Sequence, residues 1–437
     1  MTGISISVPL LIIGLGLCFW FFLFDKTKFT AAAIFIALTA GFAVLGISLR
    51  LDKLVPILII LSQLTFRAKQ GHIILFLFLS YTFVNGVIQY NYWMVPSNLN
   101  YFYGEFRWLV QFSQYLITIF LSTIITFRFS DELSRHRLTH FLIIFTFISV
   151  AAVLYQYLAL FLGLPQIGLT RTTGSVQVAS FSSHGSRIFR PGGIIGEPKA
   201  LAATMQLYLV PWIFGCLGFS GFKKATINYL GYASLLIFIL TFSTTGYVTF
   251  IVTTCVVGLV SGKVKIKRKN LTRFLMFLSV LVLGLSILGK WDIVFDLFRA
   301  RFTERISGFS QQVEDLDQLA LSIWYESWNS IFFGLGPGGV SFPMIEILMP
   351  SFDYALAPNL GLISILCDVG LLGLLLLLVP LFLPILRIKG EWHRLSYNNR
   401  AVRMMGITFL LLWLIGSSSL IYMGIGVGLI LIDINES

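Results

Sequence analysis

Charged side chains are scarce in this chain of 437 residues, because Asp, Glu, Lys and Arg make up only 11% of it and hydrophobic residues make up 57%. Soluble domains are usually about 25% charged, so the composition excludes a soluble globular protein. Apolar runs of roughly 17–25 residues recur along the chain, and each can cross a hydrocarbon core of about 30 Å. The runs do not alternate with period two, which excludes a transmembrane β-barrel. The sequence predicts an all-α polytopic membrane protein, with residues 1–437 forming a single integral membrane domain.

Cysteine and histidine are also few, and neither type forms a recognisable site. The five histidines are scattered without metal-ligand spacing, so we expect no metal and no cofactor. The first apolar run, 7–24, lacks a basic n-region and a small-residue cleavage site, so we expect a retained helix and not a signal peptide. The four cysteines lie inside apolar segments without a CxxC pair, as packing residues do; they are Cys18, Cys216, Cys255 and Cys367.

Twelve segments are candidate membrane spans. The fourth carries two polar residues, Asn85 and Gln89, and the last holds "GSSS" at 416–419, which fits a division into two short helices. We therefore expect about 12–13 transmembrane helices. The candidates are 7–24, 29–49, 54–66, 72–95, 107–127, 139–163, 198–218, 228–243, 245–262, 274–290, 359–386 and 404–433.

Lysine and arginine in the short connections predict the orientation. By the positive-inside rule we place five basic stretches in the cytoplasm: 67–72, 128–139, 219–228, 263–273 and 387–403. Stretches 25–28 and 50–53 each carry two basic residues and cannot both be cytoplasmic, so the side of the N-terminus stays open. The net charge of +12 is thus mostly a topology signal and does not indicate nucleic-acid binding.

Two long loops, 164–197 and 291–358, fall on the far side of the membrane in this arrangement. Long ordered loops are usually functional. Nine basic residues lie in the far-side loops and the adjoining helix ends, and seven of them are arginine. Arginine is preferred over lysine for bidentate contacts to phosphate or carboxylate, so this bias favours an anion site.

The first long loop ends in "SRIFRPGGIIGEPKA", residues 186–200. Its Pro-Gly-Gly sequence, 191–193, predicts a turn that brings backbone amides near Arg190. Glu197 precedes a proline at the start of the next helix, where the helix dipole favours a carboxylate. Two interpretations stay open. In the first, Glu197 is a helix-start charge paired with Arg190. In the second, Arg190 and Arg187 bind phosphate, and Glu197 either holds Arg190 in place or accepts a proton.

The second long loop contains a basic and an aromatic segment. Arg301 and Arg305 are four residues apart and share a face if the segment is helical, either binding substrate or reaching to lipid phosphates. The acidic stretch 311–319 predicts a solvated turn. The stretch "SIWYESWNSIFFGLGPGG", 322–339, predicts an aromatic-rich helix that runs into a glycine-rich turn; no strand precedes it, so it is no nucleotide fingerprint.

Two further features sit at helix ends. "TFSTTGYVTF", 241–250, predicts a tight turn whose hydroxyls, including that of Tyr247, face the loops. Asp353 and Asn359 lie at the start of the span 359–386. Asp368 lies inside this span, where a charge is costly, so it is either functional or paired with a neighbouring helix.

From about residue 100 onward the chain resembles the bacterial O-antigen polymerase (Wzy-type) and O-antigen ligase superfamily. The matching features are "R..G...EP" at Arg190–Pro198, "FSTTGY" at 242–247, Trp324 followed by "GLGPGG", and the segment 359–373 with an acidic residue before "GLLG". The resemblance implies a GT-C-like fold with two long periplasmic loops. It further implies a metal-independent membrane glycosyltransferase of the bacterial inner membrane, whose active site faces the periplasm.

The resemblance also implies roles for residues and partners. The resemblance leaves the proton acceptor unassigned; because attack by a sugar hydroxyl needs such a group nearby, Glu197 is the first choice, followed by His184 and Asp353. The implied partners are undecaprenyl-pyrophosphate-linked glycans, the lipid bilayer and a chain-length regulator protein, with no nucleic acid. The implied pyrophosphate- and glycan-binding residues are Arg190, Arg187, Arg171, Arg301, Arg305, Tyr247 and Asn359.

Within the superfamily the residues favour a polymerase of lipid-linked repeat units over a ligase. The ligase branch opens the helix at 359 with a His-Asn pair, whereas this chain has Pro358-Asn359, and the spacing to Asp368 is one residue longer than in that branch. The alternative in the same class is an O-antigen ligase that transfers glycan to lipid A-core. The alternative of another class is a flippase or transporter of lipid-linked oligosaccharide, which needs a charged central cavity that few spans here would provide.

Overall fold

The fold is known from a computed structural model of the whole chain. The residues that it describes are 3–5, 7–38, 42–44, 47–49, 51–63, 70–90, 104, 106–168, 180–183, 186–217, 221–262, 314–348, 357–417 and 419–432.

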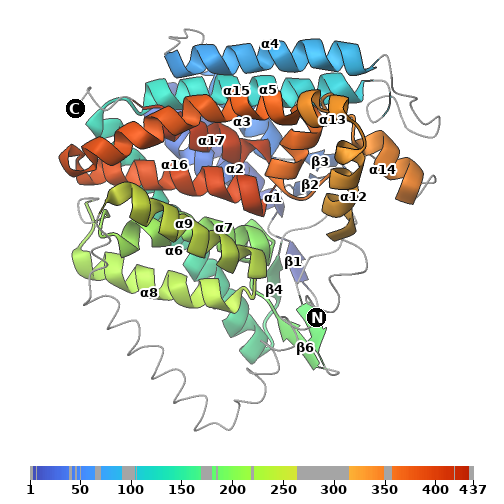
Figure 1. Cartoon of the computed structure of the whole chain (residues 1–437). Helices are drawn as coiled ribbons and strands as arrows, with labels where there is room; N and C mark the ends of the chain where they lie inside the picture. Colours follow the sequence, from blue (N-terminus) through green and yellow to red (C-terminus); the bar gives the residue numbers. More distant parts are fainter. Residues whose placement is uncertain are drawn as a thin grey trace.

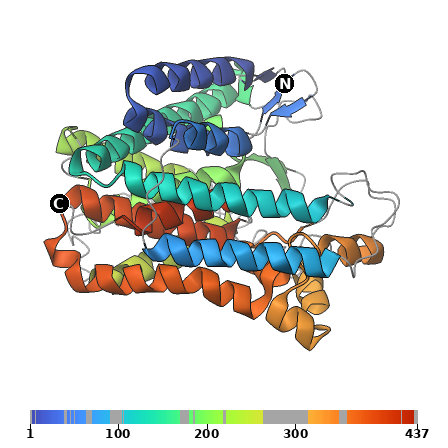
Figure 2. The ribbon, with the colours of Figure 1, turned by 90° about the horizontal axis from the view of Figure 1, so that it is seen from above.

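The described part is a bundle of helices whose long axes run roughly parallel, across the page in Figure 1. Figure 2 shows the same bundle from above, with α4 and α15 towards one edge and α1 and α2 towards the opposite one. The helices are α1 (Ser7–Phe24), α2 (Lys26–Ala37), α3 (Leu51–Leu61), α4 (Gln70–Tyr90), α5 (Arg107–Arg128), α6 (Glu132–Leu162), α7 (Pro198–Ile213), α8 (Lys224–Leu240), α9 (Thr244–Ser261), α12 (Glu314–Tyr325), α13 (Trp328–Phe333), α14 (Ser341–Leu348), α15 (Gly361–Glu391), α16 (Tyr397–Gly416) and α17 (Leu420–Ile430).

The predicted fold class, an all-α polytopic membrane protein, is confirmed. Six of the described helices are long and apolar enough to cross a membrane: α4, α5, α6, α9, α15 and α16. Helices α8 and α17 are apolar but shorter. The predicted division of the last span is also present, because α16 ends at Gly416 and α17 begins at Leu420. The predicted span 274–290 lies outside the described residues, so the expected total of 12–13 helices stays a prediction.

Short strands accompany the helices at the ends of the bundle. They are β1 (Gly3–Ser5), β2 (Phe42–Val44), β3 (Ile47–Leu49), β4 (Gln166–Gly168), β5 (Ser180–Ser183) and β6 (Ser186–Phe189), with 3₁₀ turns η1 (Gly193–Ile195) and η2 (Trp392–Arg394). β1 pairs with β4 in parallel, and β2–β3 and β5–β6 are antiparallel pairs. The predicted span 29–49 is therefore wrong in its second half: α2 ends at Ala37 and a hairpin follows. The sequence beyond Leu38 includes Gly41 and Gly46, which disfavour a helix.

The described parts of the predicted cytoplasmic stretches gather at one end of the bundle, which we call the basic end. Stretch 263–273 lies outside the described residues. Ser396 Oγ donates to Glu132 Oε1 (2.9 Å), which joins stretch 387–403 to stretch 128–139. Three further contacts involve residues in or next to these stretches: Arg137 with Asp25 (3.1 Å), Arg128 Nη2 with Gln63 Oε1 (2.5 Å), and the rings of His140 and Phe222 (4.8 Å between centroids). The first of these places stretch 25–28 at the basic end.

The opposite end, which we call the loop end, holds the N-terminal strand, the described part of the first long loop and α12–α14. The pairing of Gly3 with Gln166 joins the N-terminus to the first long loop. α2 leads from the basic end to the β2–β3 hairpin, and α3 leads back, so stretch 50–53 lies at the loop end (Figures 1 and 2). The uncertainty over the first spans is thereby resolved: relative to the basic loops, the N-terminus lies at the opposite end.

A second, smaller hydrophobic core lies apart from the main one at the loop end. It is formed by Ala320, Ile323, Leu335, Val340, Met344, Ile363 and Cys367. These residues come from α12, from the segment between α13 and α14, from α14, and from the first part of α15. We call α12–α14 together with residues 361–369 the cap. The predicted acidic turn at 311–319 is wrong from Glu314 onward, because α12 begins there.

The cap joins the bundle at a break in α15. Gly370 has φ +64° and ψ −170°, so the helix is interrupted there. Added side-chain atoms would not fit: a Cβ on Gly370 would lie 2.4 Å from the carbonyl oxygen of Phe332 and 2.5 Å from the nitrogen of Gly334. Glycine is thus required both for the backbone conformation and for the close approach of the chain that follows α13.

Candidate functional site

The segment before α7 forms a compact turn against α6. Its backbone is held by Gln156 of α6, whose Oε1 accepts from the Gly193 amide at 2.9 Å. Gly192 has no room for a side chain, because a Cβ there would lie 2.6 Å from the Gly196 carbonyl oxygen. The predicted turn is therefore present, as η1. The Gly193 amide is engaged by Gln156, so it is directed at α6.

Arg190 joins this turn to the α8–α9 junction. Its Nε donates to the carbonyl of Thr241 at 2.9 Å, and its Nη2 donates to the carbonyl of Phe242 at 3.3 Å. Phe242 has φ +48°, a left-handed conformation that is strained for a bulky residue. The guanidinium thus binds the unsatisfied carbonyls at the end of α8 and stabilises the strained link to α9. Two of the matching sequence features, "R..G...EP" and "FSTTGY", are in direct contact.

Glu197 is the N-cap residue of α7, followed by Pro198 in the first turn as predicted. Its side chain makes no capping hydrogen bond to the helix backbone, and it is exposed. The carboxylate lines a pocket of about 140 Å³ at the loop end. The pocket is lined by Glu197, Lys199, Ala200 and Ala203 of the α7 region, Thr245, Gly246 and Thr249 of α9, Leu412 and Gly416 of α16, and the neighbouring Ser417 and Tyr422.

The close approach of α7 and α9 builds the floor of this pocket. A Cβ on Gly246 would lie 2.8 Å from the Cβ of Ala202, so only glycine permits this packing. Gln206 Nε2 then donates to the Gly246 carbonyl and to the Thr249 hydroxyl, each at 2.9 Å. These contacts fix Thr245 and Thr249 opposite the first turn of α7. The pocket therefore offers a carboxylate, an ammonium group and hydroxyls on rigid elements.

The pocket is small for a whole substrate molecule. Pockets for drug-sized ligands measure roughly 300–1,000 Å³. A volume of about 140 Å³ suits a single sugar ring or a phosphate group. Among the described residues, no group of three or more His, Cys, Asp or Glu side chains is arranged to hold a metal ion.

Other predicted site residues lie elsewhere at the loop end. The Tyr247 hydroxyl donates to the Ile239 carbonyl at 2.5 Å and so points to the last turn of α8. The backbone N–H of Asn359 donates to Asp317 Oδ1 at 2.8 Å, in front of α15. Arg187 lies in β6 opposite Ser182, but its side chain is not among the described parts. The remaining predicted residues lie outside the described residues: His184, Asp353, Arg171, Arg301 and Arg305.

Asp368 has a structural partner in the glycine-rich turn, residues 334–339. It is buried, its Oδ1 accepts from the Gly338 amide at 2.9 Å, and its Oδ2 accepts from the Tyr115 hydroxyl at 2.5 Å. Gln111 also hydrogen-bonds to it, and the charge of Arg107 acts on it. Of the two interpretations of Asp368, pairing with a neighbouring helix is therefore confirmed, and the same carboxylate anchors the turn.

Side chains of α4 also hold the glycine-rich turn in place. Asn85 Nδ2 donates to the carbonyls of Phe333 (2.7 Å) and Asp368 (3.1 Å), and the Tyr81 hydroxyl donates to those of Phe333 (3.2 Å) and Val369 (3.0 Å). These bonds satisfy backbone groups that the break at Gly370 exposes. Non-helical backbone at membrane depth requires such partners.

Sequence reasoning missed two residues that matter at this end. Lys199 lines the pocket beside Glu197. A signal for it was present in the sequence, because among the nine basic residues assigned to the far side only Lys199 and Lys290 are lysines. Asp317 accepts from the amides of Asn359 and Leu360 and so satisfies the start of α15. Nothing in its acidic surroundings, residues 311–319, indicates that partner.

Comparison of the chain with known protein families and with curated proteins finds no match.

Proposed function

We propose that this protein is a membrane glycosyltransferase that polymerises undecaprenyl-pyrophosphate-linked oligosaccharide repeat units into O-antigen or a related surface polysaccharide. In this proposal the loop end faces the periplasm and the basic end faces the cytoplasm of a bacterial inner membrane. The observation that carries it is the contact between two distant sequence features of the suggested superfamily. Arg190 binds the α8–α9 junction, and Glu197 and Thr245 line one pocket beside it.

Charge at the pocket suits a lipid-linked pyrophosphate. Lys199, which is cationic, and Glu197, which is anionic, line the pocket, and the cationic Arg190 lies in the turn that precedes α7. The N-terminal end of α7 adds the positive end of its dipole, which favours a bound anion. These groups would stabilise the negative charge that develops on the pyrophosphate as it leaves.

The proposed reaction forms one glycosidic bond and breaks one bond to phosphate. A hydroxyl of the lipid-linked acceptor sugar attacks the anomeric carbon of the donor glycan. The bond from that carbon to the pyrophosphate oxygen breaks, and the lipid pyrophosphate leaves with the electron pair. The hydroxyl proton passes to Glu197, whose exposed carboxylate lies beside Thr245 and Thr249. General base catalysis of this kind contributes typically 10²–10⁴-fold to the rate.

The test replaces Glu197 by Gln and Arg190 by Lys in the source organism and separates the surface glycan on a gel. Glu346→Gln is the matched control, since this exposed carboxylate lies at the loop end on α14, outside the pocket. We expect Glu197→Gln to abolish long chains while single repeats are still displayed, with unchanged protein in the membrane. Arg190→Lys should weaken polymerisation, because one ammonium group replaces a planar group that bonds two carbonyls.

Three other outcomes overturn the proposal. Complete loss of glycan from the lipid core would indicate ligation. Accumulation of repeat units on the cytoplasmic face would indicate a flippase. Glycan of normal length with Glu197→Gln would exclude Glu197 as the base.

A further inference from the structure

Aromatic side chains of the cap are exposed to an extent that is unusual for a folded protein. Trp328 is 77% exposed and Tyr325 is 73% exposed, and Phe332 and Phe333 are also exposed. The rings of Trp328 and Phe332 lie parallel, with centroids 6.1 Å apart. We call these four residues the aromatic face. Exposed apolar patches of this kind mark a contact with a membrane, a ligand or another protein.

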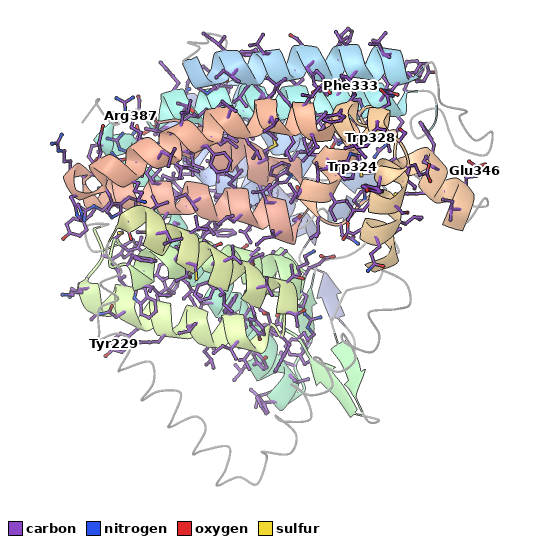
Figure 3. All side chains as sticks on the ribbon, in the orientation of Figure 1. Tyr229, Trp324, Trp328, Phe333, Glu346 and Arg387 are labelled. Carbon is purple, nitrogen blue, oxygen red and sulfur yellow. The ribbon has the colours of Figure 1, made fainter. Side chains whose placement is uncertain are left out.

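The aromatic face is continuous with the lipid-facing surface of two membrane helices. Phe333 lies beside α4 and α15 (Figure 3), α13 packs against α15, and in Figure 2 the cap follows α15 along the same edge of the molecule. The carbonyl of Phe333 is bonded to Tyr81 and Asn85 of α4. Exposed apolar side chains on the same helices are Leu77, Val84, Val87 and Ile88 of α4, and Leu372, Leu375, Val379, Leu383 and Leu386 of α15.

The depth of the aromatic face follows from these contacts. Tyr81 is bonded to Val369, so both lie at the level of the end of α13. At 1.5 Å per residue, α15 runs about 26 Å from Leu386 to Val369, and α4 continues about 10 Å from Tyr81 to Ile88. The apolar surface thus measures about 36 Å, between the roughly 30 Å of a hydrocarbon core and the roughly 40–45 Å of a whole bilayer. The end of α13 lies about 10 Å inside its boundary at the loop end.

Several backbone groups and both serine hydroxyls of the α12–α13 junction are hydrogen-bonded within the protein. The Ser327 hydroxyl accepts from the Ser330 amide at 3.1 Å, and the Ser330 hydroxyl donates to the Trp324 carbonyl at 2.7 Å. The Gly334 amide donates to the Ser330 carbonyl at 2.8 Å. Such internal bonding permits contact with lipid. Glu326, exposed in the same junction, keeps this part of the cap at the level of the headgroups.

We propose that the aromatic face enters the bilayer at the loop end, from the interface inward to the end of α13, and anchors the cap to the leaflet there. Tryptophan and tyrosine prefer the interface, because their rings are apolar and their N–H and O–H groups reach water or headgroups. The anchor fixes the height of α12 and α13 beside the break at Gly370. This inference is independent of the proposed function and holds for any activity of the chain.

Depth measurement by spin labelling tests the proposal on the full chain. The four native cysteines are replaced by alanine, and one nitroxide is attached at Trp328→Cys. The protein is reconstituted in vesicles of phosphatidylethanolamine and phosphatidylglycerol. The controls are Leu375→Cys on the lipid face of α15 and Glu346→Cys on α14, both exposed positions. Collisions with oxygen, which prefers the bilayer, and with a water-soluble nickel chelate give the depth.

We expect the label at 328 to lie deeper than the label at 346 and shallower than the label at 375. A second variant, Phe332→Cys, lies nearer to the break in α15 and should be at least as deep as 328. Nickel accessibility at 328 equal to that at 346 would show a face open to water, as for a soluble sugar ligand, and would overturn the proposal. Low accessibility to both reagents, with dipolar broadening between labels, would show a second copy of the chain on this face and would overturn it as well.

Discussion

Three arginines, two of them buried, share one role in this protein: they bind the carbonyls at the ends of helices. Arg403 donates to the carbonyls of Leu429, Ile430 and Ile432 after α17, and Arg135 donates to those of Phe129 and Ser130 after α5. Arg190 does the same after α8. The last carbonyls of a helix have no partner within it, and a cation is favoured there. A bracing role for Arg190 is thus shown, whereas phosphate binding by its charge stays a proposal.

At the same scale, Asp368 and Tyr115 form a pair whose removal can be measured. Asp368→Ala leaves the Gly338 amide and the Tyr115 hydroxyl without their acceptor in a buried place. Each unsatisfied group costs about 1–3 kcal/mol, whereas Tyr115→Phe alone should cost about 0.5–1.5 kcal/mol. Thermal unfolding of the two single variants and the double variant in detergent gives the coupling energy. Additive effects of the two substitutions would contradict a direct bond.

Asp131, at the N-cap of α6, should make stability depend on acid pH. Burial raises the pKa of its carboxyl, but hydrogen bonds from the Ser134 hydroxyl and amide and the charge of Arg135 outweigh burial, so the pKa lies below its usual value. A pKa lowered by folding stabilises the fold above the unfolded-state pKa of about 3.9, and this stabilisation is lost as pH falls through the folded-state pKa. Asp131→Ala should cost about 0.5–2 kcal/mol near neutral pH. The difference in melting temperature from the parent chain should shrink below about pH 4; a difference that is constant with pH would refute this assignment.

At the scale of elements, the break in α15 and the glycine-rich turn depend on each other. The chain that follows α13 reaches the break only because Gly334 and Gly370 lack side chains. Asp368 and Asn85 then hold the two segments together. Because the cap has its own small core, this junction determines the position of the cap relative to the bundle.

Gly334→Ala should therefore destabilise the protein, and a matched glycine provides the control. Gly334 has φ +79°, and a Cβ there would lie 2.6 Å from the nitrogens of Val369 and Gly370. Backbone strain of this kind costs about 1–3 kcal/mol. Gly390, near the end of α15, has open space where a Cβ would lie, so Gly390→Ala should be neutral or stabilising by about 0.5–1 kcal/mol. Equal melting temperatures for the two variants would contradict the described junction.

At the scale of the whole molecule, the basic end and the loop end should lie on opposite sides of the membrane. Single cysteines are placed at Glu346 on α14 and Lys389 on α15, both exposed, in a chain without its native cysteines. A membrane-impermeant maleimide added to intact spheroplasts should label position 346, and it should label 389 only after permeabilisation. Labelling of both positions in intact spheroplasts, or the reverse pattern, would contradict the orientation from the positive-inside rule.

Much of this arrangement could be predicted from the sequence, because apolar length and basic loops are local signals. The start of α7 at Pro198, the α16–α17 division and the turn after Phe333 followed from residue types in order. The end of α2, the helix at Glu314 and the partner of Asp317 did not. The end of α2 was missed although Gly41 and Gly46 follow it, because the apolar run continues past them. The partner of Asp317 depends on a contact between residues far apart in the chain, Asp317 with Asn359. For the same reason, the sequence predicted Arg190 and Glu197 as site residues without showing that Arg190 binds the α8–α9 junction.

Polymerisation by the purified protein tests the central claim most directly. The chain is reconstituted in vesicles with lipid-linked repeat units extracted from a deletion strain of the source organism, and products are separated by length. The account predicts a ladder of longer glycans with the parent chain, a rate lowered about 10²-fold or more with Glu197→Gln, and an unchanged rate with Glu346→Gln. Failure of the parent chain to extend a single repeat unit, or an unchanged rate with Glu197→Gln, would contradict it.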